Sequence, residues 1–123
     1  MEKRITGRTG MFCLIGTPVG HSGSPAMYNY SFAQTGLDYA YLAYDVPLEK
    51  TEEAVNALKV LGCKGFNVTM PCKTRVAEVV DELSDAAKLI GACNTVVVKN
   101  GKLYGNNTDG MGFVRNLKEN GVD

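Results

Sequence analysis

The sequence predicts an α/β fold, a three-layer sandwich whose mainly parallel sheet carries one antiparallel strand. Strand-like apolar runs alternate with segments of helical periodicity along the 123 residues. Polar clusters follow several of these runs, as they do where strands end in open α/β sheets. Asn100-Gly101 lies between two strand-like runs and is typical of a hairpin turn, which would reverse one strand.

The elements alternate in order along the chain. Strands are expected at Met11 to Ile15, Tyr39 to Val46, Gly65 to Val68, Thr95 to Val98 and Lys102 to Tyr104. Helices are expected at Pro25 to Gln34, Glu49 to Leu61, Thr74 to Leu83 and Gly110 to Asn120. Ser24 and Pro25 are typical of an N-cap followed by a first helical residue. Gly62 is the residue expected to end the second helix.

The segment from Gly65 to Lys73 is the most informative stretch of the chain. A short apolar strand here delivers Asn67, Thr69 and Lys73 to the start of a helix. A lysine held in a small-molecule site can carry protons to and from a ligand. The alternative is a solvated lysine in a polar loop.

A second polar cluster follows the first strand. Ser22 and Ser24 lie in a glycine-rich approach to the first expected helix. Two hydroxyls and the free N–H groups of a helix start suit an anion, and a carboxylate fits that description. Simple helix capping explains Ser24 equally well, but it leaves Ser22 unexplained.

A third cluster surrounds the last two expected strands. Asp109 falls in the first turn of the last expected helix and is a candidate to share a proton with Lys73. Asn94 would add an amide that orients a polyol, or would only bond its own backbone. Because all the clusters lie at the ends of strands, they can converge on one crevice.

Together these segments resemble the substrate-binding half of the shikimate dehydrogenase family, over nearly the whole chain from about Gly10 onward. The residues that carry the resemblance are Ser22-Gly23-Ser24-Pro25-Ala26-Met27-Tyr28-Asn29, Asn67-Val68-Thr69-Met70-Pro71-Cys72-Lys73, Ile90-Gly91-Ala92-Cys93-Asn94-Thr95 and Asn107-Thr108-Asp109-Gly110-Met111-Gly112-Phe113. Tyr28 departs from the pattern, because many members carry histidine there.

The resemblance implies an NADP-dependent oxidoreductase that interconverts 3-dehydroshikimate and shikimate in aromatic amino-acid biosynthesis. Lys73 and Asp109 would be the catalytic pair. The residues implied to bind substrate are Ser22, Ser24, Tyr41, Asn67, Thr69, Asn94 and Asp109. For Tyr41, cross-strand packing of an aromatic ring is an equally good interpretation.

Length sets the limits of this interpretation. Residues 1–123 suit one substrate-binding domain, and the C-terminal NADP-binding domain of the family is absent from this chain. Gly110-Met111-Gly112 is not a cofactor loop, because Arg115 occupies the third glycine position and no βαβ unit follows. The chain alone is therefore expected to bind substrate without turnover. A quinate/shikimate dehydrogenase using NAD or NADP, a stand-alone binding module for a polyhydroxylated carboxylate and a homodimer all stay open.

Composition agrees with a compact, soluble, cytoplasmic domain, and the resemblance implies a small-molecule substrate. Thirteen basic and thirteen acidic side chains cancel, so no footprint for nucleic acid or an anionic membrane is present. The four cysteines are dispersed and His21 is the single histidine, so no metal site is expected. Cys72 beside Lys73 is either a reactive thiol or, more often for such a cysteine, an inert small hydrophobe.

Overall fold

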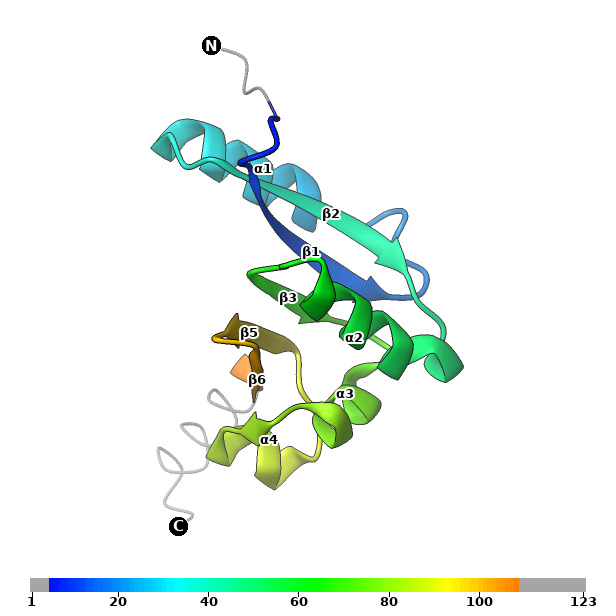
Figure 1. Ribbon diagram of the computed structural model, residues 1–123. Coiled ribbons are helices and arrows are strands. Elements are labelled where there is room, and N and C mark those ends of the chain that lie inside the picture. Colours follow the sequence, from blue (N-terminus) through cyan, green and yellow to red (C-terminus); the bar gives the residue numbers. More distant parts are fainter. Residues whose placement is uncertain (1–4, 109–123) are drawn as a thin grey trace, which may run out of the picture.

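A computed structural model describes residues 5–108 of the chain. A six-stranded sheet in the order β2-β1-β3-β5-β6-β4 forms the middle layer (Figure 1). Its strands are β1 (Gly10–Gly16), β2 (Tyr39–Asp45), β3 (Gly65–Val68), β4 (Glu82–Leu83), β5 (Thr95–Lys99) and β6 (Lys102–Asn106). The helices are α1 (Ser24–Thr35), η1 (Leu48–Lys50), α2 (Thr51–Val60), α3 (Lys73–Val79) and α4 (Asp85–Ile90).

One strand of this sheet runs against the others. β1 pairs in parallel with β2 and β3, whereas β5 is antiparallel to both of its neighbours, β3 and β6. β4 is parallel to β6. Asn100 and Gly101 form the turn between β5 and β6, both with positive φ, as the hairpin prediction requires. The predicted α/β sandwich with one reversed strand is confirmed.

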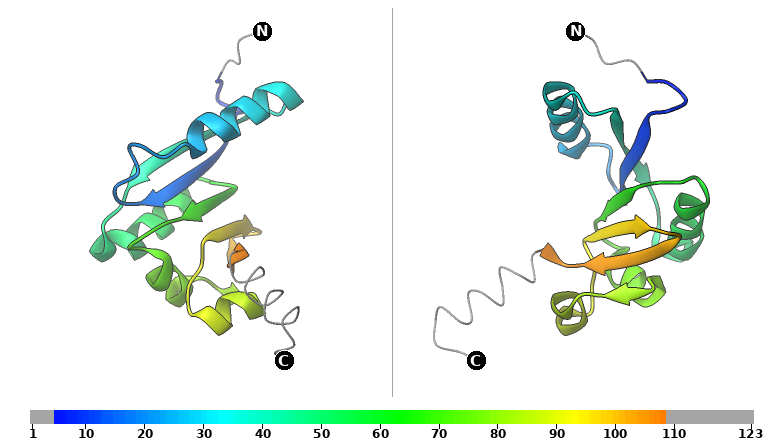
Figure 2. Two further views of the ribbon diagram at one scale, coloured as in Figure 1. Left: turned by 180° about the vertical axis from the view of Figure 1, so that it is seen from behind. Right: turned by 60° about the vertical axis from the view of Figure 1, so that its left-hand side comes forward.

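The helices lie on both faces of the sheet (Figure 2). The chain moves outward from β1 to β2 and returns past β1 to β3, so right-handed connections place α1 and α2 on opposite faces. The side chains of β1 alternate accordingly. Phe12 and Leu14 pack with Tyr28 and Phe32 of α1, whereas Cys13 belongs to the larger core on the other face.

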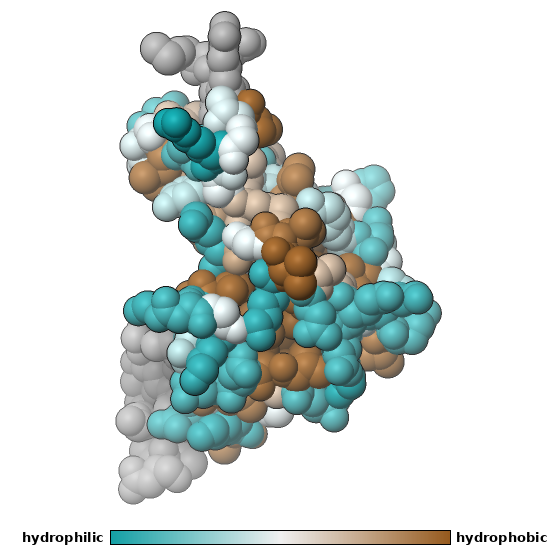
Figure 3. All heavy atoms as spheres, viewed as in Figure 1, coloured by the Kyte–Doolittle hydropathy of each residue, from teal (hydrophilic) through white to brown (hydrophobic). Residues whose placement is uncertain are grey.

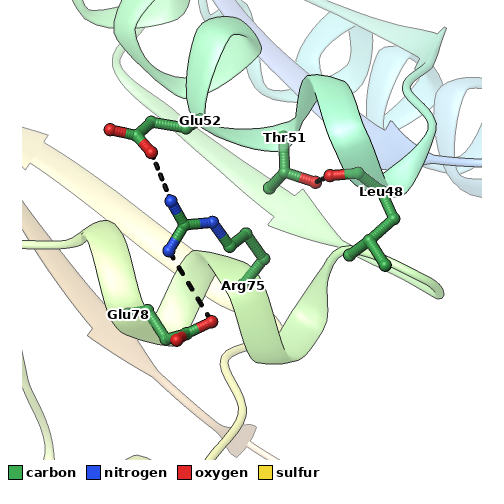
Figure 4. Close-up of polar contacts among 5 residues, drawn as sticks. All are labelled: Leu48, Thr51, Glu52, Arg75 and Glu78. Carbon is green, nitrogen blue, oxygen red and sulfur yellow. Dashed lines mark hydrogen bonds and ion pairs between the residues drawn. The ribbon is translucent and has the colours of Figure 1, made fainter.

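The larger core joins the sheet to α2, α3 and α4. Its members include Ile15, Val55, Leu58, Phe66, Val76, Ala87 and Val96. On the surface of these helices, Arg75 of α3 forms ion pairs with Glu52 of α2 and Glu78 of its own helix (Figure 4). Thr51 at the start of α2 donates to the Leu48 carbonyl oxygen at 2.8 Å, which ties the helix to η1.

One predicted helix is wrong. The segment expected to be helical from Thr74 to Leu83 is helical only as far as Val79, and β4 and α4 follow it. The Leu103 N–H donates to the Asp81 carboxylate at 2.7 Å, and the Asp81 N–H donates to the Leu103 carbonyl oxygen at 2.9 Å. Pairing with β6 therefore overrides the helical preference of this segment. The helix expected at Gly110 to Asn120 lies outside the described residues.

Candidate functional site

The serine cluster and Thr69 form a hollow where the ends of β1 and β3 meet. This edge is the switch point of the sheet, because the connections that leave β1 and β3 go to opposite faces. The hollow has a volume of about 340 Å³. Its walls are Leu14, Pro18, Val19, His21, Ser22, Ser24 and Thr69. The structure thus brings together three predicted site residues from segments more than 40 positions apart in the sequence.

The two serines have different roles at the start of α1, because Ser22 accepts a hydrogen bond from the helix backbone and Ser24 donates it. The Ser24 N–H donates to Ser22 Oγ at 3.2 Å. The helix begins at Ser24 itself, with Gly23 as its N-cap residue and Pro25 in the first turn. The prediction that Ser24 is the N-cap is therefore wrong by one residue, and capping does not occupy its hydroxyl. Both serines are half-buried on the wall of the hollow, where their O–H groups suit an anion.

Thr69 reaches this hollow because β1 ends in a glycine. The Thr69 N–H donates to the Ile15 carbonyl oxygen at 2.9 Å, so the β3–α3 loop lies directly against the end of β1. A β-carbon on Gly16 would meet Thr69 Cγ2 at 2.3 Å and the Met70 carbonyl oxygen at 2.8 Å. Gly16 also has a φ of +146°, which side chains rarely adopt. Glycine at this position is thus needed for the close approach of the β3–α3 loop to the end of β1.

A second hollow lies between α1 and the strands β3 and β5. Its volume is about 420 Å³, and Figure 3 shows it as a notch between the upper part of the molecule, which carries α1, and the lower part, which carries β5. Aromatic rings line one side, and Tyr28 stacks on Tyr41 with ring centroids 4.5 Å apart. Asn67 and Thr95 supply polar groups on the sheet side.

Hydrogen bonds connect the predicted polar residues across the sheet. Tyr41 Oη lies 2.8 Å from Asn67 Oδ1, and Asn67 Nδ2 lies 3.3 Å from Thr95 Oγ1. Thr95 Oγ1 lies 3.0 Å from Asn94 Oδ1, and Asn94 Nδ2 lies 2.9 Å from Thr108 Oγ1. Asn94 therefore does not merely bond its own backbone. This series of contacts joins four segments, namely β2, β3, the start of β5 and the residues that follow β6.

The phenol of Tyr41 stays protonated in this environment. Burial is the main cause that raises its pKa well above the ordinary range, and the nearby Tyr28 adds to the rise. The polar side chain of Ser24 acts on this pKa in the opposite direction. Ser24 thus lies within reach of Tyr41, which links the serine hollow to the chain of amides.

Lys73 is the first residue of α3 and is half-buried. Its carbonyl oxygen accepts the Cys93 N–H at 3.0 Å, which holds the start of α3 beside the residue that precedes Asn94. Lys73 does not line either of the two hollows described above. Asp109, its predicted partner, lies outside the described residues, so the pairing of the two side chains stays a prediction.

All four cysteines are free and buried. Cys72 is 0% exposed, and its thiol lies 3.2 Å from both the Val46 carbonyl oxygen and Thr51 Oγ1. These contacts favour the inert interpretation of Cys72 over a reactive one. Burial raises the pKa of Cys93 to about 11. Among residues 5–108, no three His, Cys, Asp or Glu side chains are grouped so that they could hold a metal ion.

Two residues beside the site stabilise its backbone through hydrogen bonds that the sequence pattern did not reveal. Asn29 of α1 donates to the Tyr41 carbonyl oxygen at 2.9 Å and accepts the Tyr41 N–H at 2.8 Å. It therefore covers the outer edge of β2 beside the site. Asp45 accepts from Thr17 Oγ1 at 3.0 Å and from the Val19 N–H at 3.3 Å, which fixes the loop that precedes the serines.

Comparison with known proteins adds an independent observation. Residues 14–96, more than half of the chain, match the family described as the shikimate dehydrogenase substrate binding domain. The chain belongs to this family. A curated relative from Alkaliphilus metalliredigens, named shikimate dehydrogenase (NADP(+)), is 50% identical over 122 residues, which is 99% of this chain and 43% of the relative.

Solved structures of shikimate dehydrogenases have the same fold. Shikimate 5-dehydrogenase from Listeria monocytogenes, in complex with shikimate and NAD, is 47% identical with a TM-score of 0.87, and the match covers 100% of this chain and 43% of that one. The ligand-free 5-ketofructose reductase of Gluconobacter sp. strain CHM43 is 35% identical with a TM-score of 0.83, over 93% and 41% of the two chains. The chain thus spans about 43% of the length of the shikimate dehydrogenases that it matches.

The part of the chain that the structure describes includes no helix long and apolar enough to cross a membrane.

Proposed function

We propose that this chain is the substrate-binding part of an NADP-dependent shikimate dehydrogenase that interconverts 3-dehydroshikimate and shikimate. The observation that carries the proposal is the convergence of Ser22, Ser24 and Thr69 on one hollow, beside a hydrogen-bonded chain of amides that includes Asn67 and Asn94. A ligand that places a carboxylate at the serines and hydroxyls at the amides fits this arrangement. We place NADP in a part of the protein beyond this chain, and the activity in the cytoplasm, as the resemblance implies.

The serine hollow is the end that would receive the carboxylate of the substrate. Ser22 Oγ already accepts the Ser24 N–H, so its own proton is available to donate. The start of α1 adds the positive end of a helix dipole. These groups bind an anion without a cationic side chain, which agrees with the balanced net charge of the chain.

The amide side of the site would receive the ring hydroxyls. Asn67 and Thr69 flank the end of β3, and Asn94 precedes β5 at the same edge. Amides and hydroxyls both donate and accept, so they fix the orientation of a polyol. The position of Tyr41, whose phenol contacts Asn67, is consistent with a supporting role beside the ligand.

The reaction removes a hydride and a proton from the C3 carbinol of shikimate. NADP, when bound, supplies the hydride acceptor. The residues of this chain would hold the ring and take the proton that leaves the C3 hydroxyl, with Lys73 and Asp109 as the pair that shares it. In the reverse direction the same pair returns the proton to the carbonyl oxygen of 3-dehydroshikimate.

An NMR titration of the chain with shikimate tests the binding part of this proposal. Backbone amides around Ser22, Asn67, Lys73, Asn94 and Asp109 should shift saturably. The methyl ester of shikimate is the ligand control, because it keeps the ring hydroxyls and replaces the negative carboxylate by a neutral ester. We expect it to bind at least tenfold more weakly, since charge-assisted hydrogen bonds are about twice as strong as neutral ones. Saturable binding at other residues, or equal affinity for acid and ester, would refute the assignment.

The catalytic role of Lys73 needs a longer protein that joins this chain to its NADP-binding part. Lys73→Ala should lose most of the rate of hydride transfer, while the affinity for shikimate changes little. Lys59→Ala on the exposed end of α2 is the control and should keep the wild-type rate. Full activity of Lys73→Ala would remove Lys73 from the mechanism.

A second candidate substrate is another polyhydroxylated carbonyl compound. The similarity to 5-ketofructose reductase favours keeping it, because that relative is named for a substrate without a carboxylate. Titration with quinate and with 5-ketofructose beside shikimate distinguishes these substrates. A gene that ends at this chain would instead favour a stand-alone binding module.

A further inference from the structure

The hydrogen bonds that cross the sheet all run in one direction, and one backbone N–H dictates that direction. The Thr108 N–H donates to Asn94 Oδ1 at 3.0 Å. A backbone N–H can only donate, so the Asn94 atom that faces it must be the amide oxygen. The Asn94 amide nitrogen then faces Thr108 Oγ1, at 2.9 Å.

Thr95 transmits this polarity to Asn67. Its hydroxyl lies 3.0 Å from Asn94 Oδ1, which has no proton, so Thr95 donates its single proton there. Thr95 Oγ1 can then only accept, and the Asn67 atom 3.3 Å away must be the amide nitrogen. The Asn67 oxygen is thereby turned toward Tyr41.

Tyr41 is consequently the first donor in this series of hydrogen bonds. Its phenol lies 2.8 Å from Asn67 Oδ1 and must give its proton to that oxygen. Tyr41 is 3% exposed, so bulk water does not compete for the phenol. Stacking on Tyr28 and the two backbone bonds from Asn29 hold the residue in place.

The polarity has a consequence for any ligand. Within residues 5–108, the oxygens of both amides accept hydrogen bonds, and each amide nitrogen donates one, Asn67 to Thr95 and Asn94 to Thr108. An amide nitrogen carries two protons, so Asn67 and Asn94 each keep a second N–H. The two amides therefore present donors to a ligand, and a ligand atom that accepts hydrogen bonds fits them better than one that only donates.

We propose that Tyr41 is a positioning residue which, by donating to Asn67, holds the Asn67 amide with its oxygen turned toward the phenol and one N–H directed to an oxygen of the substrate. This role rests on the proposed function, since the substrate considered is shikimate. It differs from direct contact, because Tyr41 acts through the amide of Asn67. Without the phenol, the Asn67 oxygen loses its donor, and only the longer bond to Thr95 Oγ1, at 3.3 Å, still holds the amide.

Tyr41→Phe in this chain tests the role, with NMR signals of the Asn67 and Asn94 side-chain NH₂ groups as the first readout and affinity for shikimate as the second. We expect the Asn67 protons to shift and to exchange faster with water, and the Kd to rise about five- to tenfold, as for the loss of one hydrogen bond. Tyr44→Phe on the same strand is the matched control, because its phenol contacts only Met11 Sδ, at 3.7 Å, among the described side chains. It should change neither readout.

Thr95→Val interrupts the same series of hydrogen bonds in its middle. It decides the question if Tyr41→Phe does not fold. It should alter the NH₂ signals of both Asn67 and Asn94. Unchanged Asn67 signals in Tyr41→Phe, together with a Kd within twofold of wild type, would overturn the proposal. If the wild-type chain fails to bind shikimate, the proposed function is wrong, while the NH₂ signals alone still decide whether Tyr41 orients the Asn67 amide.

Discussion

Replacing Gly16 by alanine is the sharpest test of how the serine hollow is built. The new methyl group would lie 2.3 Å from Thr69 Cγ2 and 2.8 Å from the Met70 carbonyl oxygen. The Met70 oxygen cannot simply move away, because it accepts the Thr17 N–H at 3.0 Å. The β3–α3 loop must therefore shift as a whole, and Thr69 shifts with it.

The expected cost has two parts. A residue with a side chain at a φ of +146° costs about 1 to 3 kcal/mol in backbone strain. Forcing a methyl group into a packed contact costs typically about 1 to 3 kcal/mol more. We therefore expect Gly16→Ala to lower the free energy of unfolding by about 2 to 6 kcal/mol, a large part of the stability of a small domain.

Urea unfolding followed by circular dichroism measures this cost, through the midpoint at an unchanged slope. Gly20→Ala is the matched control in the same connection, because a β-carbon there meets nothing within 4 Å. It should remain within about 0.5 kcal/mol of wild type. A Gly16→Ala chain as stable as the Gly20→Ala chain would refute the claim that the two loops need glycine for their approach.

Three further predictions concern other parts of the fold. Asn29→Ala should lower the free energy of unfolding by about 1 to 3 kcal/mol in urea, because it removes both bonds to the Tyr41 backbone, and a loss below about 0.5 kcal/mol would contradict that role. Burial raises the pKa of Cys93 from 9.0 to about 11, so the unfolded chain loses this proton first and stability falls as the pH rises from 9 to 11, by about 2 to 3 kcal/mol at most. Cys93→Ala should flatten the decline of Tm over that window, and an unchanged slope would count against this origin. Arg75→Gln should lower Tm slightly in dilute buffer and not at 1 M salt, because its partners Glu52 and Glu78 are exposed; equal losses at both salt concentrations would contradict an ionic origin.

The sequence predicted the fold well where local signals and tertiary contacts agree. The hairpin at Asn100-Gly101 is such a case, because both residues adopt the positive φ that the dipeptide favours. The stretch after Val79 is the opposite case. It holds no glycine or proline before Gly91, and its bonds to Leu103 and Gly105 of β6 are what end the helix there. Ser84, which caps α4 through the Ala87 N–H, was the local signal for the missed helix.

The meeting of the two serines with Thr69 was predictable from the sequence, but the hydrogen bonds between the clusters were not. Ser22, Ser24 and Thr69 meet as expected, because strand ends in an α/β sheet share one edge. The bond from Tyr41 to Asn67 joins strands that are not neighbours, so no spacing along the chain encodes it. Likewise, Gly16 resembles any loop glycine until the distance to Thr69 is known.

The reversed strand explains why Asn94 lies at the same end of the sheet as the serine hollow. In the pairing of β3 with β5, Asn67 lies opposite Thr95, so the start of β5 adjoins the end of β3. A parallel β5 of five residues would carry Asn94 to the far edge, about 16 Å away at 3.3 Å per residue. The antiparallel direction instead delivers Asn94 to the edge where β1 and β3 end. β6 then returns to that edge, so that Thr108 can set the polarity of the Asn94 amide. The single reversed strand is thus what assembles a row of side-chain amides and hydroxyls from segments that a fully parallel sheet would separate.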